Sequence, residues 1–276
     1  MTGIVGSTWD ADSVLAASNE WSWVPPGAEH VRTAEYLVVA YPEHFLIPTC
    51  ARVLGSLRDP AELVDEIHDV ARALGRHRLW WHLSDATRPP GLEAEVLARG
   101  GHIVEHMDVL ALPIAAAVPN LGLPDLGVPD LDVPDGIELR RVRDLDGKRD
   151  AHVVERSAFG GVEHTEEQLR QSLAELEPGL VDDSTGVVVA YVEGQPAGVG
   201  GWTLVGPVCR LWGGATHETH RGRGAYRAVL AERLGIARAV GATLGPTHGR
   251  VDTSSPILRR IGFTRYGEQR QLVLDL

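Results

Sequence analysis

Two arginines and two glycines alternate in the segment 221–224, which reads Arg-Gly-Arg-Gly. An apolar run ending at Ala215 predicts a strand before this segment, and the pattern from Ala225 to Gly241 predicts a helix after it. Glycines let the backbone turn tightly and approach a ligand closely, and the first amide N–H groups of a helix have no partner within the helix. Together with two guanidinium groups, these N–H groups predict an anion site whose natural ligand is a phosphate ester.

A simpler alternative is a surface turn in which the glycines only satisfy backbone geometry. The segment contains neither G-x-G-x-x-G nor G-K-[ST], so the dinucleotide fingerprint and the nucleotide P-loop do not fit. A helix dipole alone stabilises an exposed anion by about 0.3–1 kcal/mol, so useful affinity has to come from several N–H contacts and from the arginines.

Residues 221–226 resemble the R-x-x-G-x-G/A signature of the GCN5-related N-acetyltransferase (GNAT) superfamily, in which this loop holds the pyrophosphate of acetyl-CoA. The resemblance covers roughly residues 137–276 and includes the run SSPILRRIGF at 254–263, which is similar to the helix and strand that close such domains. One departure is Tyr226, which stands where the signature has a small residue. The resemblance implies that acetyl-CoA is the co-substrate and that it contacts Gly214, Ala215, Thr216, Arg221, Gly222, Arg223, Gly224, Ala225 and Tyr226.

The reaction implied by this resemblance is direct acetyl transfer to an amine of a small molecule or peptide in a ternary complex. Such a transfer needs a base, N–H donors for the oxyanion and an acid for the leaving thiolate. The strand at 208–215 lacks the acid that relatives often carry, and Leu258 stands where many relatives have a tyrosine. The remaining candidates for proton transfer are Glu218, His217, Tyr226 and Asp252.

A solvated turn is the alternative role for His217 and Glu218, and the missing acid and base positions motivate a competing function. In that alternative the chain is a non-catalytic acyl-CoA-binding or sensory module. His217 and His220 have no third ligand nearby in the sequence, and the two cysteines, Cys50 and Cys209, are far apart. We therefore expect neither a metal site nor a disulfide framework.

The order of predicted elements occurs twice, which indicates a divergent internal repeat. We expect a degenerate GNAT-like domain at 1–113, a Pro-rich extended linker at 114–136 and a GNAT acetyltransferase domain at 137–276. Each domain is predicted to be α/β (α+β), with a mixed, largely antiparallel sheet flanked by helices. The first copy reads GSLRDP at 55–60, and Asp59 would cap its helix and place negative charge at the pyrophosphate position.

Local patterns predict several other elements. Pro60 begins a helix with an apolar stripe, Thr165 and Gln168 form a capping box for a helix through Glu177, and residues 187–192 and 197–204 form a hairpin. A short strand is predicted at 247–251.

The chain of 276 residues carries a net charge of −12, and all of the acidic excess lies in residues 1–135, with 20 acids and 8 bases against 18 of each in 136–276. An acidic half argues against nucleic-acid and anionic membrane partners. The first ten residues lack a signal-peptide pattern, and no run is long enough to cross a bilayer, so we expect a cytoplasmic protein. The sequence does not decide the oligomeric state, and a homodimer stays open.

Overall fold

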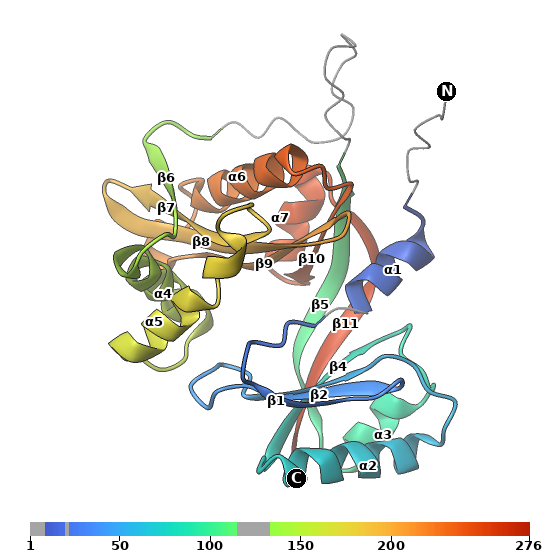
Figure 1. Ribbon diagram of the computed structural model, residues 1–276. Helices are drawn as coiled ribbons and strands as arrows, with labels where there is room; N and C mark the ends of the chain where they lie inside the picture. Colours follow the sequence, from blue (N-terminus) through green and yellow to red (C-terminus); the bar gives the residue numbers. More distant parts are fainter. Residues whose placement is uncertain (1–8, 20–21, 115–132) are drawn as a thin grey trace. The chain divides into compact units, whose positions relative to one another are not determined.

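The computed structural model describes residues 9–19, 22–114 and 133–276 (Figure 1). These residues divide into two compact units. Unit 1 is formed mainly by Ala111–Thr247 and Ile261–Thr264, and unit 2 by Ala11–Leu110, His248–Arg260 and Arg265–Leu276. Most of the predicted linker, 115–132, lies outside the described residues, so the division at 1–113, 114–136 and 137–276 stays a prediction about the sequence repeat. No helix among the described residues is long and apolar enough to cross a membrane.

Unit 2 contains a mixed sheet covered on one face by α2 (Pro60–Ala73) and α3 (Leu92–Ala98) (Figure 1). Its strands pair in the order β1-β2-β3-β4-β11, and all neighbours are antiparallel except β3 and β4. The strands are β1 (Glu29–Arg32), β2 (Tyr36–Ala40), β3 (Thr49–Val53), β4 (Arg78–Ser84) and β11 (Thr264–Asp275), and the helices are α1 (Ala11–Asn19), α2 (Pro60–Ala73) and α3 (Leu92–Ala98). A further strand, β5 (His102–Pro113), runs from unit 2 into unit 1.

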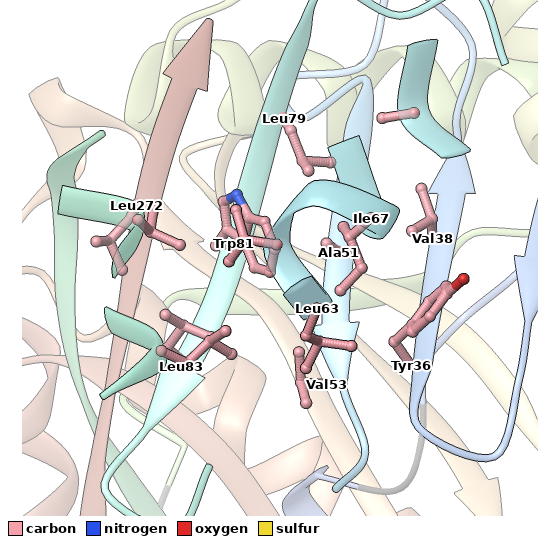
Figure 2. Close-up of a cluster of buried hydrophobic side chains, with 14 residues drawn as sticks. Tyr36, Val38, Ala51, Val53, Leu63, Ile67, Leu79, Trp81, Leu83 and Leu272 are labelled. Carbon is pink, nitrogen blue, oxygen red and sulfur yellow. The ribbon is translucent and has the colours of Figure 1, made fainter. Parts of the chain in front are cut away.

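Helix α2 forms as its sequence predicts. The Asp59 side chain accepts hydrogen bonds from the amides of Ala61 and Glu62, and Pro60 occupies the first helical position, where no N–H is needed. Figure 2 shows Leu63 and Ile67 directed from α2 toward Trp81 of β4, and all three side chains are fully buried. This alignment of one apolar helix stripe with one strand face forms the core of unit 2.

The strands of unit 1 are largely antiparallel, with α6 on one face and α4 and α5 on the other (Figure 1). Strands β6, β7, β8 and β9 pair as antiparallel neighbours, and β10 joins β9 in parallel. The elements are β6 (Ile137–Arg141), α4 (Leu145–Phe159), α5 (Glu166–Ala174), η1 (Glu177–Gly179), β7 (Thr185–Val192), β8 (Gln195–Val205), β9 (Val208–Thr216), η2 (Glu218–His220), α6 (Ala225–Ala239) and β10 (Leu244–Arg250). The capping box of Thr165 and Gln168 is present, although α5 ends at Ala174 rather than at Glu177.

The internal repeat is visible in the topology. In the first copy β3, α2, β4, α3 and β5 follow one another, and in the second copy β9, α6, β10, α7 (Ser254–Ile261) and β11 do so. Each copy places one parallel strand pair around its central helix. The closing strand β11 pairs with β4 of the first copy along Gln269–Asp275. A strand that comes late in the chain therefore completes the sheet of unit 2.

Candidate functional site

The loop before α6 leaves a helix N-terminus available to a ligand. Gly222 and Gly224 have φ angles of 78° and 87°, a region that favours glycine, and α6 begins at Ala225. No side chain caps this helix, and its first turn contains no acidic residue. A Cβ on Gly224 would lie 2.6 Å from Cγ of Pro134, so this position requires glycine for its space as well as for its φ angle. Uncapped amides and the positive end of a helix dipole favour anions, so this terminus is a candidate anion site.

The two arginines of the loop differ in their surroundings. Arg223 forms an ion pair with Glu193 of the β7–β8 turn, with 2.7 Å between Nη2 and Oε1. Arg221 is exposed and has no ion-pair partner among the described residues. The loop therefore holds one unpaired guanidinium and one that is shared with an exposed carboxylate.

Strand β9 contains a β-bulge just before the loop. Its pairing with β8 joins Gly201 to Trp212 and Val199 to Ala215, so Gly213 and Gly214 together face Gly200. Gly213 has a φ angle of 61°, which is typical of a bulge that begins with glycine. The extra residue leaves the ladder, and its backbone groups become available at the edge of β9.

Strands β9 and β10 pair at only one position, Val208 with Leu244. The amide of Leu244 donates to the carbonyl of Pro207 at 3.3 Å, and the next amide on the same side would belong to residue 246. That residue is Pro246, which has no N–H, so the ladder stops there. The hydroxyl of Thr247 donates to the carbonyl of Leu211 at 2.9 Å, and no ladder pair joins the strands beyond Val208. Among the described residues, β10 therefore forms no ladder hydrogen bond with the stretch of β9 from Gly213 to Thr216. Strand β10 is longer than the strand predicted at 247–251, because β10 begins before Pro246.

Helix α6 lies close to the sheet because three glycines face it. A Cβ on Gly198 would lie 3.1 Å from Cβ of Ala225, and one on Gly200 would lie 2.7 Å from Cζ of Arg233. A Cβ on Gly214 would lie 3.2 Å from both Nη2 of Arg233 and Cε2 of Tyr226. The side chains of Val199 and Ala215 point to the opposite face and pack in the core with α4.

Tyr226 directs its ring toward the sheet, with Cε2 3.2 Å from the position of a Cβ on Gly214. Its hydroxyl lies 3.6 Å from the position of a Cβ on Gly214, and it interacts with the guanidinium of Arg233. Burial raises the pKa of Tyr226, while Arg233 acts in the opposite direction. The phenol therefore stays protonated at neutral pH, and the bulky residue at this position leaves the anion-binding terminus open.

The other predicted proton-transfer residues are differently placed. His217 accepts a hydrogen bond from the amide of Thr219 and begins η2, and its own amide donates to the carbonyl of Ala197 at 2.9 Å. Glu218 is exposed, and its amide donates to the hydroxyl of Ser157 on α4 at 3.1 Å. Asp252 lies in the turn after β10, in unit 2. His217, Glu218 and Tyr226 thus belong to unit 1, in the segment that follows β9, whereas Asp252 belongs to unit 2.

The corresponding region of the first copy differs at every point. Strands β2 and β3 pair without a register shift, and β3 and β4 keep three successive pairs, from Cys50–Trp80 to Arg52–His82. The loop that precedes α2 is occupied by its own side chains, because Asp59 caps the helix and Arg58 pairs with Glu35 and Glu66. In this described region of the first copy, β2 and β3 therefore pair without a bulge, β3 stays paired with β4, and the N-terminus of α2 is capped.

Solved structures share this architecture over nearly the whole chain. A GCN5-related N-acetyltransferase from Kribbella flavida is 20% identical, with a TM-score of 0.65, and the match covers 95% of this chain and 94% of that chain. A tandem GNAT protein from the clavulanic acid biosynthesis pathway is 18% identical, with a TM-score of 0.59, and coverage is 95% and 87%. A GCN5-related N-acetyltransferase from Sphaerobacter thermophilus is 18% identical, with a TM-score of 0.61, and coverage is 87% and 80%. No protein-family model and no curated protein matches the chain.

These similarities establish the class of fold. The chain has the GNAT fold in its tandem form, as the sequence predicts.

Sequence reasoning missed three features of the site: the bulge, the proline in β10 and Arg233. Each had a signal in the sequence. Adjacent glycines inside a strand, as in WGGAT, indicate a bulge, and a proline inside a strand marks the end of a ladder. Arg233 falls on the apolar stripe of α6 between Leu230 and Leu234, where a charged side chain needs a buried partner.

Proposed function

We propose that unit 1 is an acetyl-CoA-dependent N-acetyltransferase, which transfers the acetyl group directly to an amine of a small molecule or peptide in a ternary complex. The observation that carries this proposal is the opening between β9 and β10. It combines an early end of the ladder, a bulge and an uncapped helix N-terminus along one continuous segment, 208–226.

Each part of this segment suits one part of acetyl-CoA. The amides of α6 and the free guanidinium of Arg221 suit the pyrophosphate. The unpaired backbone groups of Gly214, Ala215 and Thr216 suit the amides of the pantetheine arm, which can add to β9 in place of β10. A backbone N–H at the bulge suits the carbonyl oxygen of the thioester, which develops negative charge during the transfer. These assignments agree with the residues that the sequence resemblance implies.

The first copy supplies an internal comparison, because it has the same topology without these features. Its capped helix, intact ladders and occupied loop leave no place for a pyrophosphate or a pantetheine arm. We therefore assign one acetyl-CoA site per chain, in the second copy. A cytoplasmic location and assembly as a homodimer remain expectations from the sequence.

A second function is favoured by a specific observation. Leu258, at the position of the tyrosine found in many relatives, is 1% exposed and carries no proton, and β9 has no acidic side chain. These two facts favour a non-catalytic acyl-CoA-binding or sensory module. Only turnover separates the two functions, because both bind acetyl-CoA.

The test is release of CoA thiol from acetyl-CoA across a panel of primary amines and amino-terminal peptides, with binding measured in parallel by thermal shift. Gly224→Glu introduces a side chain and a negative charge at the helix N-terminus, and we expect it to abolish both turnover and the shift. Gly241→Glu is the matched control: it places the same residue at a similar φ of 78°, at the other end of α6, in open space. Turnover in the wild type and in Gly241→Glu, but not in Gly224→Glu, supports the proposed enzyme activity. Tight binding without turnover by any amine supports the sensory module.

A further inference from the structure

Arg233 is a buried cation placed at the bulge of β9. It is 2% exposed and projects from α6 toward the sheet. Its Nε donates to the carbonyl of Val229 in its own helix, and its Nη1 donates to the carbonyls of Gly201 and Trp212, all at 3.3 Å. Gly201 and Trp212 are the paired residues at one side of the bulge. The guanidinium therefore bridges β8 and β9 where their register shifts.

The sheet provides a recess for this guanidinium. A Cβ on Gly200 would lie 2.7 Å from its Cζ, and a Cβ on Gly214 would lie 3.2 Å from its Nη2. No carboxylate among the described residues pairs with Arg233; the titratable groups that face it are Tyr226 and Cys209. Burial of a cation without a counterion costs folding free energy. A guanidinium kept in this recess therefore suggests a role in function that offsets this cost.

Tyr226 is the side chain on which Arg233 can act in such a functional role. Its hydroxyl and Nη2 of Arg233 both lie at the same glycine, 3.6 Å and 3.2 Å from the position of a Cβ on Gly214. A guanidinium has only donors, so it can interact with the phenol only through the phenol oxygen, and the phenol keeps its own O–H for a second partner. Tyr226 is therefore held as a proton donor at the bulge, next to the exposed backbone of β9.

We infer that Tyr226 protonates the CoA sulfur as it leaves, and that Arg233 is the positioning residue that holds the hydroxyl at the bulge and stabilises the phenolate. This inference rests on the proposed function and names a proton donor for it. It also accounts for Tyr226 at a position where the signature has a small residue, in a chain that has leucine at the usual tyrosine position.

The neutral amine forms a C–N bond with the acetyl carbon, the C–S bond breaks, and its electron pair goes to sulfur. The O–H proton of Tyr226 moves to that sulfur and gives CoA thiol, which leaves a phenolate beside the Arg233 guanidinium. The proton lost by the amine nitrogen returns to the phenolate through solvent, so the products are the acetylated amine and free CoA.

The first experiment compares Tyr226→Phe with the wild type. Removal of a general acid lowers kcat by a factor of about 100 to 10,000, while the ring and its packing stay. We expect a loss of about 100-fold in kcat, a change of less than about threefold in acetyl-CoA affinity, and loss of the high-pH limb of the kcat profile. Tyr191→Phe is the matched control, because it removes another hydrogen-bonded hydroxyl, that of Tyr191 to Asp150, from the same unit.

The second experiment tests the role of Arg233 without turnover. The ionisation of Tyr226 is followed by ultraviolet absorbance, as the difference between each protein and its Tyr226→Phe counterpart. We expect the titration to move to higher pH in Arg233→Met and to move much less in Arg233→Lys, which keeps the charge. A purely structural Arg233 would leave the titration of Tyr226 unmoved in both variants, provided that both remain folded by circular dichroism.

The results distinguish this inference from the proposed function. A wild type that binds acetyl-CoA but acetylates no amine overturns both together. A Tyr226→Phe enzyme that keeps its kcat, or that loses acetyl-CoA binding in step with kcat, overturns only the proton-donor role. If Arg233→Met fails to fold, an unmoved titration in Arg233→Lys, together with a full loss of kcat in that variant, overturns the positioning role.

Discussion

The two arginines of the loop before α6 carry the same formal charge but are not equally free to bind an anion. Arg221 faces solvent without an ion-pair partner among the described residues, whereas the exposed carboxylate of Glu193 lies 2.7 Å from Arg223. A phosphate that binds Arg223 has to displace or share this carboxylate. The ion pair is exposed, so the competition is weak and depends on salt.

Glu193→Gln is therefore expected to tighten acetyl-CoA binding by a factor of about two to five at low ionic strength, because an exposed ion pair of this kind opposes binding only modestly. The measurement is isothermal titration calorimetry at two salt concentrations, and the gain should shrink at the higher one. Glu177→Gln serves as the control, because it removes one negative charge from the exposed η1 turn. An equal gain in both variants would mean that only net charge matters.

For single residues, the sequence predicted which residue types are present in the loop better than it predicted where their side chains point. The glycines and arginines of the loop were identified from their order, because a positive φ and a close approach are properties of the backbone that glycine marks directly. The direction of the Tyr226 ring could not be predicted, since it depends on a recess made by Gly200 and Gly214 on two other strands.

Among the elements, β9 carries the two features on which the proposed binding of the acyl donor rests. Adjacent glycines form a bulge in its pairing with β8, and a proline ends the parallel ladder with β10. Both features are local, and both could in principle be recognised. The predicted strand began only at residue 247, because a proline within a run is normally taken as the boundary of a strand.

Pro246→Ala is expected to restore one amide donor and to let the ladder extend by one hydrogen bond toward Cys209. The closed edge then competes with the pantetheine arm, so we expect acetyl-CoA affinity to fall by a factor of about five to ten, which corresponds to the net value of about one hydrogen bond. Hydrogen exchange reports directly on the new amide at residue 246.

Pro196→Ala is the control for this change, because it alters a proline at the start of β8, in the β7–β8 hairpin. Unchanged affinity together with a protected amide at 246 would show that closing the ladder does not obstruct the donor.

At the scale of the whole molecule, the sequence revealed the repeat but not the exchange of its last strand. Element order and apolar periodicity are local signals, so two copies of one topology could be read from the chain. The pairing of β11 with β4 depends on contacts between residues far apart in sequence, such as Gln269 with Ser84, and no local pattern encodes them.

The core of unit 2 also predicts acid sensitivity. His68 of α2 is 5% exposed and packs edge-on against Trp81, with 5.8 Å between the ring centroids. Burial, together with the positive charges of Arg99 and Arg72, lowers the pKa of His68 to about 4. In the unfolded chain this histidine becomes protonated near pH 6.5, whereas in the folded chain it becomes protonated only near pH 4. The free energy of unfolding therefore falls as the pH drops from about 6.5 to about 4, by up to about 3 kcal/mol.

His68→Leu removes this titration and keeps an apolar side chain against Trp81. We expect the difference in the free energy of unfolding between pH 7 and pH 5, measured by urea titration, to be smaller in the variant than in the wild type. Some acid sensitivity should remain, because burial also lowers the pKa of His82 well below its usual value. An identical pH dependence in both proteins would exclude His68 as a source.

The position of β11 has a consequence for how the protein is made. Strand β4 pairs with Gln269–Asp275, and the side chain of Leu272 belongs to the same buried cluster as Trp81 (Figure 2). On the ribosome, the strands of unit 2 emerge early, yet one side of β4 stays without its partner until the entire second copy has been translated. During that interval the first copy exposes an unpaired strand edge and part of its apolar core, which makes it the stage of synthesis at which the nascent chain most needs protection from aggregation.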